Sequence, residues 1–238
     1  MVKRCLLILL IMGIMLTGVF GIGVGFAAPK EVNIGVLVIL SGGGADLGVM
    51  SRDGAKLAME DINAAGGIKA LGGAKVNLVV RDITSEASQC VMTAERLFTR
   101  QKLAAAIGCG RSEFTFSTLP IISKHRVPMV TSSIADKITD SGCKYIFEPC
   151  PRGSQFGHMQ VDFLKFLQEK YTIPIEKVGV AYEDSSYGTA TGKGVKERCE
   201  KAGYNVVLDQ PYSASITDAT PLVTKMRGAN IDVAFLVI

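Results

Sequence analysis

Four short segments of the chain combine glycine with hydroxyl-bearing or acidic side chains, and each follows an apolar run predicted to be a strand. They are Ser41–Gly48, Gly108–Ser112, Thr131–Ala135 and Glu183–Gly188. Such segments offer backbone N–H groups and hydroxyls that bind small polar molecules. In a parallel sheet, ligands bind outside the carboxyl ends of the strands. The sequence therefore predicts a small-molecule site formed by these segments.

Ser112 is the strongest single candidate for a ligand contact. It lies where a predicted helix begins, so its hydroxyl is beside unpaired backbone N–H groups and the positive end of the helix dipole. This arrangement can bind a carboxylate. The alternative is that Ser112 only caps its helix, which is what most serines at such positions do.

The sequence shows no catalytic or cofactor motif. The glycine-rich segment after the first strand lacks the G-x-G-x-x-G spacing, and Asp46 would place negative charge where a pyrophosphate must lie. Ser141–Lys144 matches S-x-x-K, but its companion motifs are missing. With two histidines and no C-x-x-C, the sequence also gives no basis for a zinc site. We therefore predict a protein that is not an enzyme and binds no cofactor or metal.

Strands and helices alternate along the whole chain. The predicted strands are 32–40, 76–80, 103–107, 127–130, 145–147, 177–182, 205–208 and 232–238, and the predicted helices are 46–65, 87–100, 112–124, 155–170, 188–202 and 220–227. This order predicts an α/β fold with two doubly wound parallel-sheet lobes.

The boundary between the lobes is predicted at Glu148-Pro149-Cys150-Pro151, because two closely spaced prolines favour an extended link. The lobes are then residues 29–148 and 149–238. The second is expected to be incomplete, since it has only three predicted strands and the last, apolar one ends the sequence.

Residues 1–28 are predicted to be a cleaved signal peptide. Lys3 and Arg4 precede the uncharged run Cys5–Gly25, and Ala27 and Ala28 offer a cleavage site. An uncleaved membrane anchor is the alternative, which the glycines of the run disfavour. The sequence thus predicts a periplasmic protein without a lipid, because there is no cysteine at the cleavage point.

The mature chain would carry 24 basic and 22 acidic residues, a net charge of about +2 that gives no reason to expect a nucleic-acid partner. Its cysteines are Cys90, Cys109, Cys143, Cys150 and Cys199. In an exported chain they predict one or two disulfides plus buried thiols, in a connectivity that the sequence does not reveal.

Several segments resemble the branched-chain amino-acid binding protein family of ABC transporters. They are Ile34–Leu37, Ser41–Gly42, Gly48, Arg52–Ile68, Val127–Ser132, Tyr187–Gly188, Thr217–Asp218 and Ile231–Val233. The run N-A-A-G-G-I at Asn63–Ile68 is the most specific of them, and the resemblance covers about residues 31–238.

The resemblance implies a type I periplasmic binding protein, a monomer that closes two lobes around an amino acid or similar small polar molecule and delivers it to a membrane permease. An exported ligand-sensing receptor domain of the same fold is the alternative. The family pattern places the ligand carboxylate near Ser112 and the segment from Ser133 to Ala135. It places an aromatic contact at Tyr187 and a ligand side-chain contact at Leu47.

Two positions depart from this family pattern. Glu113 stands where the family usually has a small residue, and Ala135 replaces its usual threonine or serine. The ligand can therefore be an amide, a urea or an aromatic acid as alternatives to an amino acid.

Overall fold

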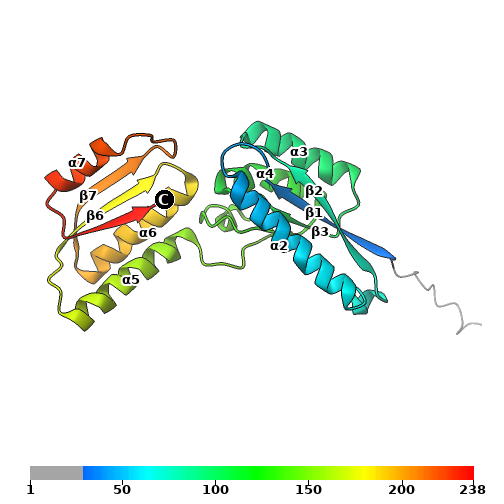
Figure 1. The fold of residues 1–238 in the computed structure, drawn as a ribbon, viewed down its shortest axis with the longest axis horizontal. Helices are drawn as coiled ribbons and strands as arrows, with labels where there is room; N and C mark the ends of the chain where they lie inside the picture. The colour runs from blue at the N-terminus through cyan, green and yellow to red at the C-terminus, as the bar shows by residue number, and fades with distance from the viewer. Residues whose placement is uncertain (1–28) are drawn as a thin grey trace, which may run out of the picture.

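The computed structural model describes residues 29–238, which form two parallel β-sheets, each with helices packed against it (Figure 1). The predicted signal peptide lies outside the described residues. Among residues 29–238, no helix is long and apolar enough to cross a membrane.

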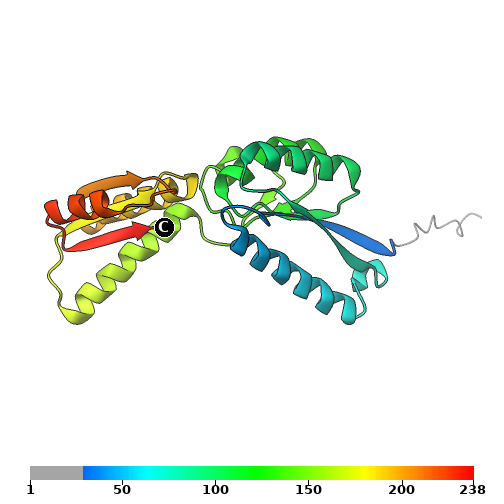
Figure 2. The same cartoon turned by 45° about the horizontal axis from the view of Figure 1, so that its top comes forward.

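The first sheet has five strands in the order β2-β1-β3-β4-β5, all parallel. They are β1 (Glu31–Val38), β2 (Lys75–Asp82), β3 (Ala105–Gly108), β4 (Met129–Val130) and β5 (Ile146–Phe147). Its helices are α2 (Ala45–Ala64), α3 (Ala87–Arg100) and α4 (Ser112–His125), with short 3₁₀ turns at Lys69–Leu71 and Thr139–Ser141. Because the strand order reverses after β2, right-handed crossovers put α2 on one face and α3 and α4 on the other (Figures 1 and 2).

The second sheet has the order β7-β6-β8 and is also parallel. Its elements are α5 (Gly153–Tyr171), β6 (Lys177–Glu183), α6 (Ser186–Ala202), β7 (Asn205–Tyr212), α7 (Thr220–Gly228) and β8 (Val233–Val237). The predicted class of two parallel-sheet lobes is confirmed. The residue boundary between the lobes stays a prediction, although the change of sheet between β5 and β6 agrees with it.

Most strand ends differ from the prediction by one or two residues, and two of the differences involve proline. Strand β4 starts at Met129 rather than Val127, because Pro128 has no N–H and contributes only its carbonyl, which accepts from Ala106 N. Strand β7 runs on to Tyr212, through Pro211. As an edge strand it tolerates a proline whose nitrogen needs no partner.

The N-terminus of α5 is attached to the loop that follows β4. Arg152 donates to Asp136 O at 2.9 Å and pairs with Asp140 at 2.5 Å, and Ser154 N–H donates to the Asp136 carboxylate at 3.1 Å. These contacts cross from the first lobe to the start of the second.

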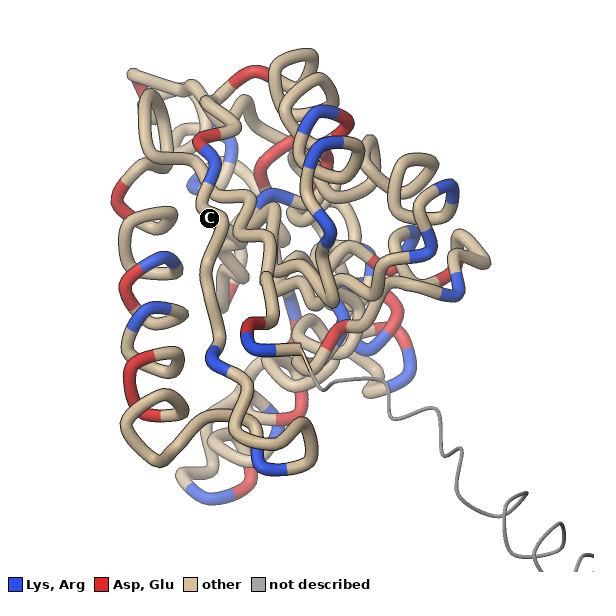
Figure 3. Tube along the Cα trace, turned by 90° about the vertical axis from the view of Figure 1, so that its right-hand side faces the viewer, with Lys and Arg blue, Asp and Glu red and all other residues tan. Residues whose placement is uncertain are grey.

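Basic and acidic residues are interspersed along the helices (Figure 3), in keeping with the small net charge.

Helices α5 and α6 approach closely at two glycines. A Cβ added at Gly157 would lie 2.5 Å from Val195 N, and one added at Gly194 would overlap the backbone of Ser154. Such distances are well inside van der Waals contact, so the helices could not keep this spacing with larger residues.

We predict that Gly157→Ala lowers the free energy of unfolding by at least about 2 kcal/mol, because it overpacks the α5–α6 contact. The control is Gly54→Ala on α2, where an added Cβ meets nothing within 4 Å. That change should leave stability unchanged or raise it by up to about 1 kcal/mol, since alanine favours helix. The free energies of unfolding of both variants are measured by urea denaturation. Equal changes in the two variants would contradict the packing argument.

Glu148, at the end of β5, carries a buried carboxylate. Among residues 29–238 neither carboxylate oxygen has a hydrogen-bond partner. Burial raises the pKa of this carboxyl, the charge of Arg152 opposes the rise, and the charge of Asp136 adds to it. The folded protein therefore holds this proton more tightly than the unfolded chain, and stability falls as pH rises through the raised pKa.

We predict that Glu148→Gln raises the unfolding temperature by a few degrees at pH 7.5, where burial opposes the ionisation of the wild-type carboxyl. The gain should disappear near pH 4, where the wild-type carboxyl keeps its proton. Melting curves at both pH values, with the exposed-site variant Glu176→Gln as control, test this. A gain that is the same at both pH values would show that ionisation is not its cause.

Candidate functional site

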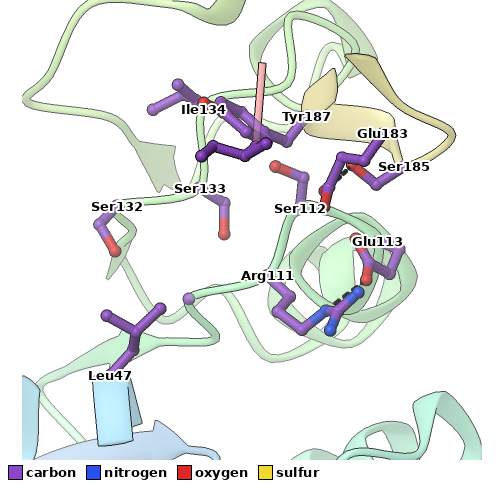
Figure 4. A pocket seen from close by; sticks show the side chains of 12 residues that line it. Leu47, Arg111, Ser112, Glu113, Ser132, Ser133, Ile134, Glu183, Ser185 and Tyr187 are labelled. Atoms are coloured by element: carbon purple, nitrogen blue, oxygen red, sulfur yellow. Dashed lines mark hydrogen bonds and ion pairs between the residues drawn. The ribbon is translucent and has the colours of Figure 1, made fainter. Parts of the chain in front are cut away.

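A cavity of about 340 Å³ lies between the two lobes, at the carboxyl ends of the strands (Figure 4). From the first lobe it is lined by Leu47, Gly110, Arg111, Ser112, Glu113, Ser132, Ser133 and Ile134, and from the remainder of the chain by Glu183, Ser185, Tyr187 and Ile238. In Figure 4, Leu47 of α2 and Tyr187 of α6 lie on opposite sides of it. Apart from Ile238, its walls therefore come from segments predicted to bind a ligand or from the residue directly after one of them, Glu113.

The start of α4 brings Ser112 to the cavity. Strand β3 ends at Gly108, whose φ of 145° favours glycine, and a Cβ there would overlap the Leu37 carbonyl. The helix begins four residues later at Ser112, so its first-turn N–H groups face the carboxyl edge of the sheet. The first helical bond runs from Thr115 N to Arg111 O.

The alternative role of Ser112 as a helix cap is wrong. Arg111, in extended conformation, occupies the N-cap position, and Ser112 is the first helical residue. Its Oγ instead accepts a hydrogen bond from Ala135 N–H at 3.3 Å. Ser112 thus joins α4 to the loop after β4, and only 3% of its surface is exposed.

Buried hydroxyls hold the same loop in place. Thr115 Oγ1 accepts from Cys109 N–H at 3.2 Å and lies 2.7 Å from Ser133 Oγ and 3.3 Å from Thr131 Oγ1. All of these side chains are buried. Because buried polar groups cost free energy when unpaired, this network fixes the loop in one arrangement.

The opposite wall is the start of α6. Ser185 caps this helix by accepting from Gly188 N–H at 3.0 Å, and its hydroxyl donates to the Glu183 carboxylate. The pKa of Tyr187 is raised by burial and by the charge of Glu183, so its phenol stays protonated at neutral pH. Tyr187 can therefore donate a hydrogen bond to a ligand and offer it an apolar ring face.

The Glu113 charge beside Ser112 is balanced within the site. Arg111 Nε lies 2.5 Å from the Glu113 carboxylate, and its guanidinium also lies over the Phe114 ring at 5.7 Å. This pair leaves the cavity with one further acid, Glu183 on the opposite wall. Both walls thus carry the positive end of a helix, α4 on one side and α6 on the other, and the Glu183 carboxylate lies beside the start of α6.

Four of the five residues predicted to contact a ligand line this cavity, namely Leu47, Ser112, Ser133 and Tyr187. Ala135 does not; it is buried behind Ser112 and contributes its N–H. Ser133 is on the wall, but its hydroxyl already pairs with Thr115. The prediction of single residues missed Ser132, Ile134, Glu183 and Ser185, although all lie in or beside the four segments that the strand ends indicated.

A family model described as periplasmic binding protein matches residues 31–238. The chain belongs to the periplasmic binding protein family. Its resemblance to the branched-chain amino-acid binding proteins is confirmed by relatives named Leu/Ile/Val-binding protein homologs. One, homolog 7 of Brucella abortus, is 32% identical over 213 residues, which are 87% of this chain and 52% of the relative.

Solved structures of this binding-protein family agree with the fold. The branched-chain amino acid transporter substrate binding protein LivJ of Streptococcus pneumoniae, in complex with isoleucine, is 30% identical with a TM-score of 0.73, covering 87% of this chain and 57% of that one. A solute binding protein from Rhodopseudomonas palustris in complex with 3,4-dihydroxybenzoic acid shares the fold at 20% identity and a TM-score of 0.76, covering 88% and 55%. The chain spans about half the length of these relatives.

We predict that Thr115→Val lowers the free energy of unfolding by about 2–3 kcal/mol, because it leaves Cys109 N–H and the Ser133 hydroxyl buried without their partner. The control is Thr118→Val on the same helix, whose hydroxyl donates to the Thr115 carbonyl. That change leaves no backbone N–H or hydroxyl without its partner, removes only a weak contact to the Cys109 sulfur, and should cost about 1 kcal/mol or less. Denaturant unfolding measures both, and similar losses would mean that the network adds no stability.

Proposed function

We propose that this chain is part of the exported solute-binding component of an ABC transporter and binds an amino acid or similar small polar molecule between its lobes. The observation that carries the proposal is the cavity whose walls combine the start of α4 with Glu183, Ser185 and Tyr187. Export is supported by the N-terminal sequence, and delivery to a membrane permease by the family.

The charges of the cavity favour a ligand with both a carboxylate and an ammonium group. The N–H groups of Ser112, Glu113 and Phe114 precede the first helical bond of α4, and the helix dipole makes this end positive. A ligand carboxylate is attracted there. On the opposite wall, the Glu183 carboxylate attracts a cation. An aromatic acid would use the first wall, and a ring hydroxyl could donate a hydrogen bond to Glu183, but it would lack the charge attraction that an ammonium group gains there.

Closure of the lobes follows from the same geometry. A ligand held only by α4 gains few contacts, whereas one that also touches Tyr187 is buried from both sides and offsets the entropy lost on binding. Such a ligand binds the closed form better than the open form and shifts the population towards it. No chemical step is required for this function.

The test starts from a thermal-shift screen of the full-length protein against amino acids, amides and aromatic acids, because a ligand that binds only the folded state raises the unfolding temperature. Calorimetry with the best ligand then follows. We predict that Ser112→Ala weakens binding by about 1.5–3 kcal/mol if Ser112 meets a charged group, and that Tyr187→Ala weakens it by about 2 kcal/mol or more.

The matched control is Ser117→Ala, on the same helix; its hydroxyl donates to the Glu113 carbonyl, and it does not line the cavity. Its affinity should equal that of the wild type. The proposed site would be contradicted if Ser112→Ala and Tyr187→Ala both bound as tightly as the control. If the best ligand is an aromatic acid and both variants still bind it more weakly, the proposed site stands, but the ligand class changes from an amino acid to an aromatic acid.

A further inference from the structure

Two cysteines from different elements touch inside the first lobe. The Sγ atoms of Cys90 and Cys109 are 3.8 Å apart, and the two residues are separated by 19 positions in the chain. Cys90 lies in the first turns of α3, and Cys109 directly follows β3. Both are buried, with 0% and 1% of their surfaces exposed. In residues 29–238 all five cysteines are free thiols, so the disulfides expected from the sequence are not formed in this structure.

We propose that Cys90 and Cys109 form a disulfide when the protein folds in an oxidising compartment. The sulfur atoms are about 1.8 Å farther apart than the disulfide bond length of about 2.05 Å, so the two side chains must rotate to close this gap. Helix and strand already hold the two residues together. The other three cysteines have different neighbours: Cys143 accepts from the Ser123 hydroxyl, Cys150 lies near Glu148, and Cys199 is in the core of the second lobe.

The surroundings of the two sulfur atoms differ in the folded lobe. The hydrogen bond from the Cys90 thiol lowers the pKa of Cys109, and the Thr118 hydroxyl, 3.8 Å from Cys109 Sγ, acts in the same direction. The same contact, together with burial, raises the pKa of Cys90. Gly108, Cys109 and Gly110 also line a second cavity of about 740 Å³, so this segment borders open space.

The oxidation is a thiol–disulfide exchange that needs a disulfide oxidant, such as oxidised glutathione or a dithiol oxidoreductase. While the chain folds and the two thiols are still accessible, the Cys109 thiolate attacks the oxidant disulfide, forms a mixed disulfide and releases one thiol. The Cys90 thiolate then attacks the Cys109 sulfur, which releases the second thiol. The two cysteines lose two protons and two electrons, and the oxidant is reduced to two thiols.

The disulfide would reinforce the candidate site. Cys109 N–H donates to Thr115, whose hydroxyl meets Ser133 in the loop after β4. A bond from Cys109 to α3 therefore ties this network to a second helix. It also lowers the conformational entropy of the unfolded chain, because it closes a loop that contains most of α3 and all of β3.

The test refolds the reduced full-length protein in a glutathione redox buffer, blocks remaining thiols, and maps peptides by mass spectrometry without reduction. We expect a Cys90–Cys109 linked peptide and an unfolding temperature about 5–10 °C above that of the reduced protein. Cys90→Ala and Cys109→Ala should each lose both effects, whereas Cys143→Ala and Cys150→Ala should keep them.

The mapping on wild-type protein stands even if a variant fails to fold. The proposal is overturned if Cys90 and Cys109 are both found blocked in protein that has refolded under oxidising conditions. It is equally overturned if either of them is linked to a different cysteine. Neither result depends on the identity of the transported ligand.

Discussion

The hydroxyl of Thr115 is the contact on which the first-lobe side of the cavity depends. It joins the backbone of Cys109, just after β3, to Ser133, just after β4. Without it, the remaining hydrogen bond between these two segments within residues 29–238 would be the one from Ala135 N–H to Ser112. Because the network is buried, its hydrogen bonds are stronger than they would be in water, and the cavity wall is preformed before a ligand arrives.

The same hydrogen-bond network lies between the candidate ligand cavity and the Cys90–Cys109 pair. On its outer side, Ser112 and the first turn of α4 face the cavity. On its inner side, Cys109 contacts Cys90 of α3 in the hydrophobic core. Oxidation of this pair would therefore act on the rigidity of the site rather than on its chemistry. The charged side chains of the cavity are also paired in advance. Arg111 pairs with Glu113 on the α4 side, and Glu183 lies on the opposite wall.

The fold could be predicted from the sequence because alternating apolar runs and helical patterns report burial directly, and parallel strands put their carboxyl ends at one edge. That edge is where the cavity lies, so the segments were predictable even where single residues were not. The role of Ser112 was harder. Its partner Ala135 is 23 residues away, and no local pattern distinguishes a cap from a contact to a distant loop.

Long-range contacts explain the other gaps as well. The pairing of Thr115 with Ser133, and that of Cys90 with Cys109, depends on strand order and helix position, which only the folded chain brings together. The close approach of α5 and α6 at Gly157 is likewise invisible in a helical pattern, where glycine counts only as a poor helix former.

The central claim is that one small molecule bridges the two lobes through this cavity. It is tested most directly by measuring the distance between spin labels at Ser51→Cys on α2 and Lys193→Cys on α6, both at exposed positions, in the full-length protein. The account predicts that saturating ligand shortens and narrows the distance distribution. A distribution unchanged by a ligand that is shown to bind would contradict it.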